Sequence, residues 1–257
     1  MMERHIDIAT PSGAMETFAV HPSEGGPHPA VILYMDVWGI REELLDIARR
    51  IATVGYYCVV PDFYYRQGRV RNEFRNEKNQ MISLDRLDEQ RKQLVLAPLA
   101  KLTDAMVIED TDCVLRFIDR GEPVRPGPVG VVGYCMGGRH VFRVMGHFPQ
   151  RIRASACLHG SLIVTDDGDS PHLSAMKGAG ELYCGLAEKD RHAQMPTIKA
   201  LNETSWNLQY RYELHKGAHH GYALPDRDVF DKHAFNRDWE LIFAMFRRQI
   251  PLLLSSS

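Results

Sequence analysis

The stretch VGVVGYCMGGRHVF, from Val129 to Phe142, decides the fold. Its first residues are continuously apolar, as in a strand buried on both faces, and a helical pattern follows them. Between the two, GYCMG matches the nucleophile elbow G-x-S-x-G with Cys135 in the serine position. The turn strains its central residue, and Gly133 and Gly137 meet its demand for neighbours without a Cβ. We expect Cys135 to project from the sheet edge at a helix N-terminus, which stabilises a thiolate and an oxyanion.

Short apolar runs alternate with helical patterns around this stretch, from about residue 30 to the C-terminus. Such alternation predicts a doubly wound, mostly parallel α/β sheet flanked by helices. Single α/β domains commonly reach this length, so we expect one domain over residues 1–257. The expected strands are Ala30–Tyr34, Tyr56–Val60, Val129–Val132, Ala154–Leu158, Glu181–Gly185 and Tyr210–Leu214, and the expected helices are Glu42–Val54, Ser83–Leu99, Thr103–Asp119, Gly138–Phe148 and Val229–Gln249.

Charge and hydropathy exclude several classes of partner. The formal net charge is -2 and both signs are interspersed, so we expect no nucleic-acid partner. The N-terminal residues lack a signal-peptide pattern, and no apolar run approaches the ~18 residues that span a bilayer, so we expect a cytoplasmic protein without a membrane partner. We expect a monomer or homodimer acting on a small molecule.

The five cysteines form an odd set without a CxxC pair, which fits a disulfide framework or a zinc site poorly. Cys58, Cys157 and Cys184 sit in apolar runs and are expected in the core. A metal site built from His215, His219, His220 and Asp190 is a weaker alternative, because adjacent histidines rarely ligate one ion. We therefore expect no metal and no cofactor.

A nucleophile elbow requires an acid and then a histidine further along the chain. GLAEKD places Asp190 after one expected strand, and KGAHHGY places His219 and His220 after the next. Parallel strands end at the same edge of a sheet, so these loops can converge on Cys135. Glu188 competes with Asp190, and His219 competes with His220. The acidic loop that contains Asp166, Asp167 and Asp169 is expected to be solvated surface.

These segments resemble the dienelactone hydrolase family of the α/β-hydrolase superfamily, from about residue 15 to 250. GYCMGG is similar to the family's cysteine elbow, MDVWGI (Met35–Ile40) to its acidic loop, GLAEKD to its aspartate loop, GAHHGY to its histidine loop and VVPDFYYR to its P-D-L/F-Y segment. The resemblance implies an α/β-hydrolase fold. It also implies an esterase-like hydrolase that cleaves small carboxylic esters or lactones through a Cys–His–Asp catalytic triad.

The resemblance also implies roles for single residues. His220, rather than His219, falls on the catalytic position, and Met136 and Val37 fall on the positions whose N–H groups form the oxyanion hole. Asp36 falls on a glutamate that pairs with the cysteine in the resting enzyme, and it is one methylene shorter.

The family's substrate-binding positions are less well matched. An arginine that binds the lactone carboxylate is replaced by Leu224, the nearest arginine being Arg227, while Arg91 could supply one cation. The aromatic residues that usually follow that cation are replaced by Val95 and Pro98. Trp38, Tyr64 and Tyr222 suggest an aromatic pocket, although core packing explains each of them equally well.

Two further points stay open at this level. The polar stretch Arg66–Asp85 is either a loop that shapes the site or a surface connection, and its composition favours the surface. General ester hydrolysis competes with dienelactone hydrolysis proper, which lacks the expected arginine. A non-hydrolytic thiol switch on the same fold is the third alternative, because low-pKa thiols oxidise readily. Asp190 and His220 favour a hydrolase, since a sensor needs neither.

Overall fold

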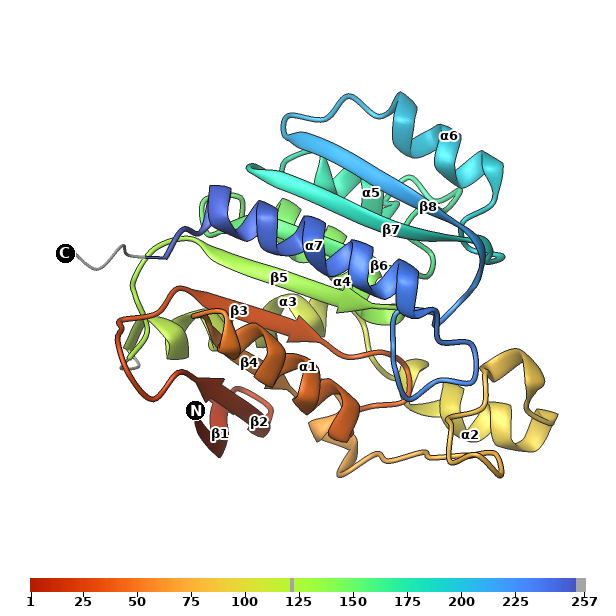
Figure 1. Ribbon diagram of the computed structural model, residues 1–257, viewed down its shortest axis with the longest axis horizontal. Helices are drawn as coiled ribbons and strands as arrows, with labels where there is room; N and C mark the ends of the chain where they lie inside the picture. The colour runs from red at the N-terminus through yellow and green to blue at the C-terminus, as the bar shows by residue number, and fades with distance from the viewer. Residues whose placement is uncertain (121–122, 253–257) are drawn as a thin grey trace.

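The computed structural model describes residues 1–120 and 123–252. Eight strands form one sheet in the order β1-β2-β4-β3-β5-β6-β7-β8, and from β4 to β8 all neighbours are parallel (Figure 1). The predicted strands correspond to β3 (Ala30–Tyr34), β4 (Tyr57–Pro61), β5 (Val129–Tyr134), β6 (Ile152–Leu158), β7 (Glu181–Lys189) and β8 (Gln209–His219). Cys58, Cys157 and Cys184 are fully buried in them, as expected from their apolar surroundings.

An N-terminal hairpin extends the sheet beyond the strands that the sequence predicted. It consists of β1 (Met2–Thr10) and β2 (Gly13–His21), which pair antiparallel with each other, and β2 also pairs antiparallel with β4. Most side chains of β1 are exposed, as is typical of an edge strand, so this strand has no continuous apolar run. The hairpin lies at the edge of the sheet remote from β7 and β8.

Helices cover both faces of the parallel part of the sheet, as the apolar strands require. Figure 1 shows α1 (Glu42–Thr53) and α7 (Lys232–Gln249) on one face, and α3 (Asp104–Arg120) and α4 (Met136–His147) on the other. The side chain of Asp231 caps the N-terminus of α7 by accepting from two backbone N–H groups. The shorter helices are α2 (Glu89–Leu99), α5 (Pro171–Ala175) and α6 (Met195–Glu203), and the 3₁₀ turns are η1 (Tyr65–Gln67) and η2 (Leu84–Arg86).

The segment from residue 66 to 85 forms a cap beside the chain that follows β3. Most of its side chains are exposed or half-buried, as its composition favours, and the segment also borders the cluster next to Cys135. Met81 in this segment is fully buried, and it packs in a second apolar cluster with Trp38 and Val95. Cys135 borders the same cluster. The apolar residues of the segment are few, so its polar composition conceals the burial of Met81.

Backbone bonds join this cap to the chain that follows β8. The Met81 N–H donates to the Asp226 carbonyl at 2.7 Å, and the Asp228 N–H donates to the Met81 carbonyl at 3.0 Å. The carboxylate of Asp228 also accepts from the Ser83 hydroxyl at 2.5 Å. The cap is therefore fixed to the loop between β8 and α7.

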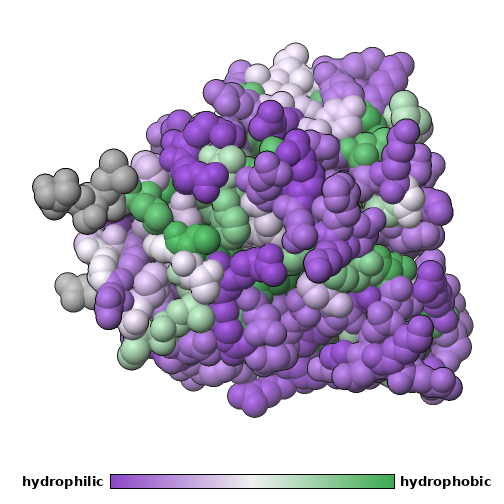
Figure 2. All heavy atoms as spheres, in the orientation of Figure 1, coloured by the Kyte–Doolittle hydropathy of each residue, from purple (hydrophilic) through white to green (hydrophobic). Residues whose placement is uncertain are grey.

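Within residues 1–120 and 123–252, no helix combines the length and the apolar character that crossing a bilayer requires. The face drawn in Figure 2 is mostly hydrophilic, with hydrophobic residues in separate small patches.

Candidate active site

The turn between β5 and α4 places Cys135 in strained backbone geometry. Cys135 has φ 54° and ψ −113°, a conformation that residues with a Cβ rarely adopt. A Cβ on Gly133 would lie 2.1 Å from the carbonyl oxygen of Gly137, and one on Gly137 would lie 2.4 Å from that of Tyr34. Both glycines are therefore required by close backbone contacts, as the elbow motif predicts. Cys135 is half-buried at the N-terminus of α4.

The loops after β7 and β8 bring Asp190 and His220 together. Nδ1 of His220 lies 2.6 Å from Oδ2 of Asp190, within hydrogen-bonding distance. The carboxylate is buried, and its Oδ1 accepts from the backbone N–H of His192 at 2.8 Å. Gln194 donates to the backbone carbonyl of Asp190 at 2.7 Å, which fixes the loop. Because Nδ1 is engaged by Asp190, Nε2 is the nitrogen of His220 that remains for proton transfer.

Cys135 and His220 perturb each other's proton affinity. Burial disfavours a thiolate, but the positive charge of His220 and a hydrogen bond from Ser161 outweigh it and lower the pKa of Cys135. Burial likewise disfavours an imidazolium, but the negative charge of Cys135 and the bond to Asp190 raise the pKa of His220 to about 10. This combination favours a thiolate–imidazolium pair, the form in which cysteine is nucleophilic.

The competing residues lie elsewhere. Glu188 is exposed, and its carboxylate accepts from the backbone N–H of Gly217 at 2.8 Å. His219 ends β8 and pairs with Lys189 in the sheet register. His215 contacts the buried carboxylate of Asp238 at 2.7 Å. Asp166, Asp167 and Asp169 are exposed, as expected for a solvated loop.

Over the part of the chain that the structure describes, no three His, Cys, Asp or Glu side chains are grouped as a metal ion would require.

The two residues expected at the oxyanion hole lie on either side of one buried tyrosine. Val37 follows β3, and Met136 is the first residue of α4. The hydroxyl of Tyr64 donates to the Val37 carbonyl at 3.3 Å and lies 3.4 Å from the sulfur of Met136. Tyr64 is fully buried, and its hydroxyl thus links the Val37 backbone to the Met136 side chain.

Asp36 is bound by arginine. The guanidinium of Arg41 donates to Oδ1 and Oδ2 of Asp36 at 2.7 and 3.1 Å, and it also binds Asp226 at 2.6 Å. The backbone N–H of Trp38 donates to the same carboxylate at 3.1 Å. Both oxygens of Asp36 are thus occupied. Its pairing with Cys135, which the family resemblance implies, stays a prediction.

Arg227 is the arginine that the structure brings to this site. Its guanidinium lies 3.7 Å from Asp36 and 5.0 Å from the centre of the Trp38 ring, and the residue is buried. Within the described residues its Nε has no hydrogen-bond partner. Leu224, which replaces the family's arginine, lies in the main core. The backbone N–H of Arg227 donates to the Leu224 carbonyl at 3.0 Å, so a turn separates the two residues. Matching residues by sequence position alone does not show this turn.

Two of the remaining predicted substrate contacts are held by other side chains. Arg91 is exposed at the start of α2, where it lies 3.4 Å from Asp88 and over the ring of Phe74. Tyr222 is fully buried, and its hydroxyl donates to Asp238 at 2.7 Å. Trp38, by contrast, packs in the apolar cluster that borders Cys135.

The loop after β6 contributes residues that the sequence did not single out. Oγ of Ser161 lies 3.3 Å from the sulfur of Cys135, and the ring of His159 lies 5.0 Å from that of His220. The position of these residues at the end of a predicted strand was the signal that could have identified them. Because β6 is parallel to β5, its carboxyl end lies at the same edge of the sheet as Cys135.

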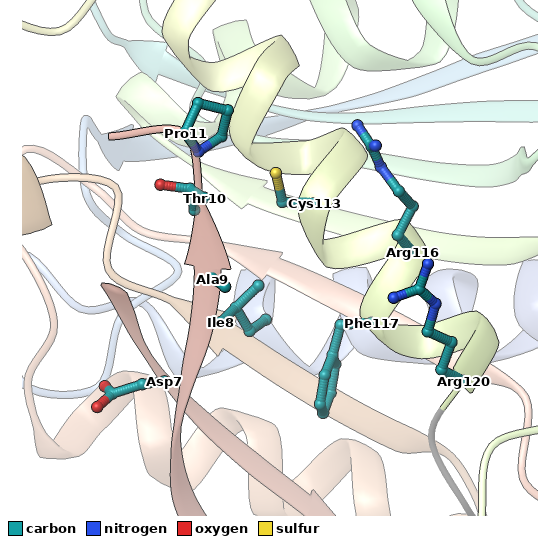
Figure 3. A pocket seen from close by; sticks show the side chains of 9 residues that line it. All are labelled: Asp7, Ile8, Ala9, Thr10, Pro11, Cys113, Arg116, Phe117 and Arg120. Carbon is teal, nitrogen blue, oxygen red and sulfur yellow. The ribbon is translucent and has the colours of Figure 1, made fainter. Parts of the chain in front are cut away.

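A separate hollow of about 460 Å³ lies between β1 and α3. Figure 3 shows Cys113 and Phe117 of α3 facing the strand across it. The elements that hold Cys135, Asp190 and His220 contribute none of its lining residues.

Comparison with known proteins places this geometry in a family. The model of the dienelactone hydrolase family matches residues 15–250. A Methylorubrum extorquens protein assigned as a carboxymethylenebutenolidase is 28% identical over 65% of this chain and 51% of its own length. The chain thus spans about half the length of that relative. A Synechocystis protein with the same assignment is 21% identical, with 91% of each chain covered.

A solved structure shows the shared fold. A Klebsiella pneumoniae protein assigned as a dienelactone hydrolase superposes with a TM-score of 0.82 at 22% identity, over 96% of this chain and 98% of that one. The α/β-hydrolase fold predicted from the sequence is therefore confirmed. The family match covers most of the chain, including Cys135, Asp190 and His220, and the chain belongs to the dienelactone hydrolase family.

Proposed function

We propose that this protein hydrolyses small carboxylic esters or lactones, with Cys135 as the nucleophile. His220 acts as general base and acid, and Asp190 holds its imidazole in the required tautomer. The observation that carries the proposal is the 2.6 Å contact between His220 and Asp190, beside a cysteine held in an elbow. Family membership supports the same class of reaction.

The proposed reaction proceeds through a thioester. The thiolate attacks the carbonyl carbon, and the resulting oxyanion accepts hydrogen bonds from the N–H groups of Met136 and Val37. The intermediate collapses, the carbon–oxygen bond to the leaving group breaks, and His220 donates its proton to the departing alkoxide. Water then attacks the thioester with His220 as base, which releases the acid and restores the thiol proton to the pair. A lactone follows the same course, with the alkoxide remaining attached to the acyl chain.

Hydrolysis of p-nitrophenyl acetate and butyrate by wild-type protein and by Cys135→Ala tests the proposal. We expect turnover by the wild type and none above background by the variant. Cys113→Ala is the matched control, because this thiol lies in the hollow between β1 and α3, away from the elbow. Equal turnover in wild type and Cys135→Ala would remove the cysteine mechanism.

A lactone bearing a carboxylate is the second candidate substrate, and Arg227 favours it. This buried guanidinium borders the Cys135 cluster through Trp38 and retains an unpartnered Nε within the described residues. A buried donor without a partner is unfavourable, and a substrate carboxylate would satisfy it. The relatives assigned as carboxymethylenebutenolidases support a substrate of this kind.

Arg227→Met separates the two substrate classes. We expect it to lower kcat/KM for cis-dienelactone at least tenfold more than for p-nitrophenyl acetate, because only the lactone carries a carboxylate. Comparing the two substrates on one variant cancels any general loss from disturbing Asp36. An equal loss on both would assign Arg227 to structure and leave neutral esters as the substrate class.

A further inference from the structure

We propose that the hydroxyl of Ser161 donates a hydrogen bond to the Cys135 thiolate and holds the sulfur ready for attack. Ser161, supplied by the loop after β6, would then assist the proposed triad of Cys135, His220 and Asp190. The inference rests on the proposed function, in which Cys135 is the nucleophile.

The contact is held by the backbone on both sides. Oγ of Ser161 lies 3.3 Å from the sulfur of Cys135, a normal distance for a hydrogen bond to sulfur. The backbone N–H of Ser161 donates to the Cys135 carbonyl at 3.0 Å, and the Cys135 N–H donates to the Leu158 carbonyl at 3.1 Å. The serine hydroxyl therefore reaches the sulfur from a fixed backbone position.

Close backbone packing explains how Ser161 arrives there. A Cβ on Gly138 would lie 2.7 Å from the Cα of Gly160, so the loop after β6 approaches the first turn of α4 as only glycines allow. The residue before Gly160, His159, has φ 38° and turns the chain at the strand's end. The turn and the paired glycines place the next residue, Ser161, beside the elbow.

Ser161 differs in kind from the other groups around the sulfur. His220 and Arg227 bring positive charge, which favours the thiolate, while Asp36 brings negative charge, which opposes it. Tyr64 also lies close enough to be affected by the thiolate's charge. A hydroxyl stabilises the thiolate through a neutral hydrogen bond and does not compete for the thiol proton at ordinary pH.

The neutral hydrogen bond from Ser161 leaves the proton of His220 available for the leaving group. His220 must leave the sulfur and donate its proton to the alkoxide as the intermediate collapses. With Ser161 donating to the sulfur, the thiolate keeps a neutral hydrogen-bond donor until it attacks the carbonyl carbon, after which the sulfur is bonded to that carbon and carries no charge. The serine thus supports the anion without consuming the proton that the leaving group needs.

Alkylation of Cys135 by iodoacetamide, followed across pH by mass spectrometry of its peptide, tests this role without requiring turnover. In Ser161→Ala we expect the midpoint of the alkylation profile to rise by about one pH unit, which lowers the rate about tenfold below the midpoint. Ser155→Ala is the matched control. Ser155 lies on β6 as well, and its buried hydroxyl has no hydrogen-bond partner within residues 1–120 and 123–252. We expect the wild-type profile for this control.

The outcomes distinguish the inference from the function on which it rests. A wild-type midpoint below the ordinary thiol range that is unchanged in Ser161→Ala would overturn the role of Ser161 and leave the cysteine mechanism intact. A wild-type midpoint at the ordinary thiol value would overturn the activated nucleophile itself. We also expect kcat for p-nitrophenyl acetate to fall in Ser161→Ala with KM little changed, because the hydroxyl contacts the sulfur rather than the bound ester.

Discussion

The variant Asp190→Asn tests whether Asp190 orients the imidazole of His220. It can keep the bond that holds the loop and changes the group that faces the imidazole. Oδ1 of Asp190 accepts from the backbone N–H of His192, whereas Oδ2 lies 2.6 Å from Nδ1 of His220. Asparagine can keep the first bond through its carbonyl oxygen and then presents an NH₂ group to the imidazole. An NH₂ group donates and cannot accept, so the neutral ring must carry its proton on Nε2, facing Cys135. A ring in that tautomer cannot accept the thiol proton.

The size of the effect follows from this geometry. The same change in the serine triad of chymotrypsin-type proteases costs about 10⁴ in kcat. Here the thiol has an additional donor in Ser161, so we expect a loss of about 10³- to 10⁴-fold, equivalent to about 4–5.5 kcal/mol of transition-state stabilisation. Loss of a buried charged hydrogen bond also lowers the free energy of unfolding by about 1.5–3 kcal/mol.

Steady-state hydrolysis of p-nitrophenyl acetate measures the loss, at a temperature well below the melting point of the variant. Glu188→Gln is the matched control, because this nearby carboxylate is exposed and binds only the loop at Gly217. We expect the control to stay within about twofold of wild type. Activity of Asp190→Asn within threefold of wild type would refute the orienting role, as would an equal loss in Glu188→Gln.

Four further predictions rest on the same contacts. The kcat/KM of wild-type protein should fall at alkaline pH with a midpoint of about 10, where His220 loses the proton that it gives to the leaving group; a pH–rate profile flat to pH 11 would contradict this. The raised pKa also makes the folded protein bind this proton more tightly than the unfolded chain does. The contribution of His220 to stability is complete below about pH 6.5 and is lost as the pH rises to about 10, whereas the lowered pKa of Cys135 contributes in the opposite direction, so the net loss that urea titrations measure is smaller than His220 alone would give. Gly137→Ala should destabilise the fold by more than about 3 kcal/mol, because its Cβ would lie 2.4 Å from the Tyr34 carbonyl; wild-type stability on thermal unfolding would show that the elbow can relax. Arg41→Met should cost about 3–5 kcal/mol, because it leaves Asp36 and Asp226 without their shared cation, and a loss below 1 kcal/mol in denaturant unfolding would contradict the ion network.

Much of the fold was predictable because its signals are local in the sequence. Each central strand is a short apolar run, and the elbow between β5 and α4 needs its glycines within a few residues of Cys135. The hairpin of β1 and β2 escaped prediction because an exposed edge strand has no continuous apolar run. The composition of the cap favoured a surface connection because polar residues outnumber its apolar ones, and it gave no sign that Met81 is fully buried.

The sequence by itself determined the α/β-hydrolase fold, the membership of the dienelactone hydrolase family and the order of Cys135, Asp190 and His220, whose catalytic roles stay predictions. Only the tertiary structure decided which side chains surround them. Arg41 meets Asp226 across 185 positions of sequence, and Ser161 reaches Cys135 across 26. Such contacts depend on how loops from separate strands pack at one sheet edge, where a shift of an ångström makes or breaks a hydrogen bond. Local patterns specify strands and turns, whereas the partners of a buried charge or thiol are set by that packing.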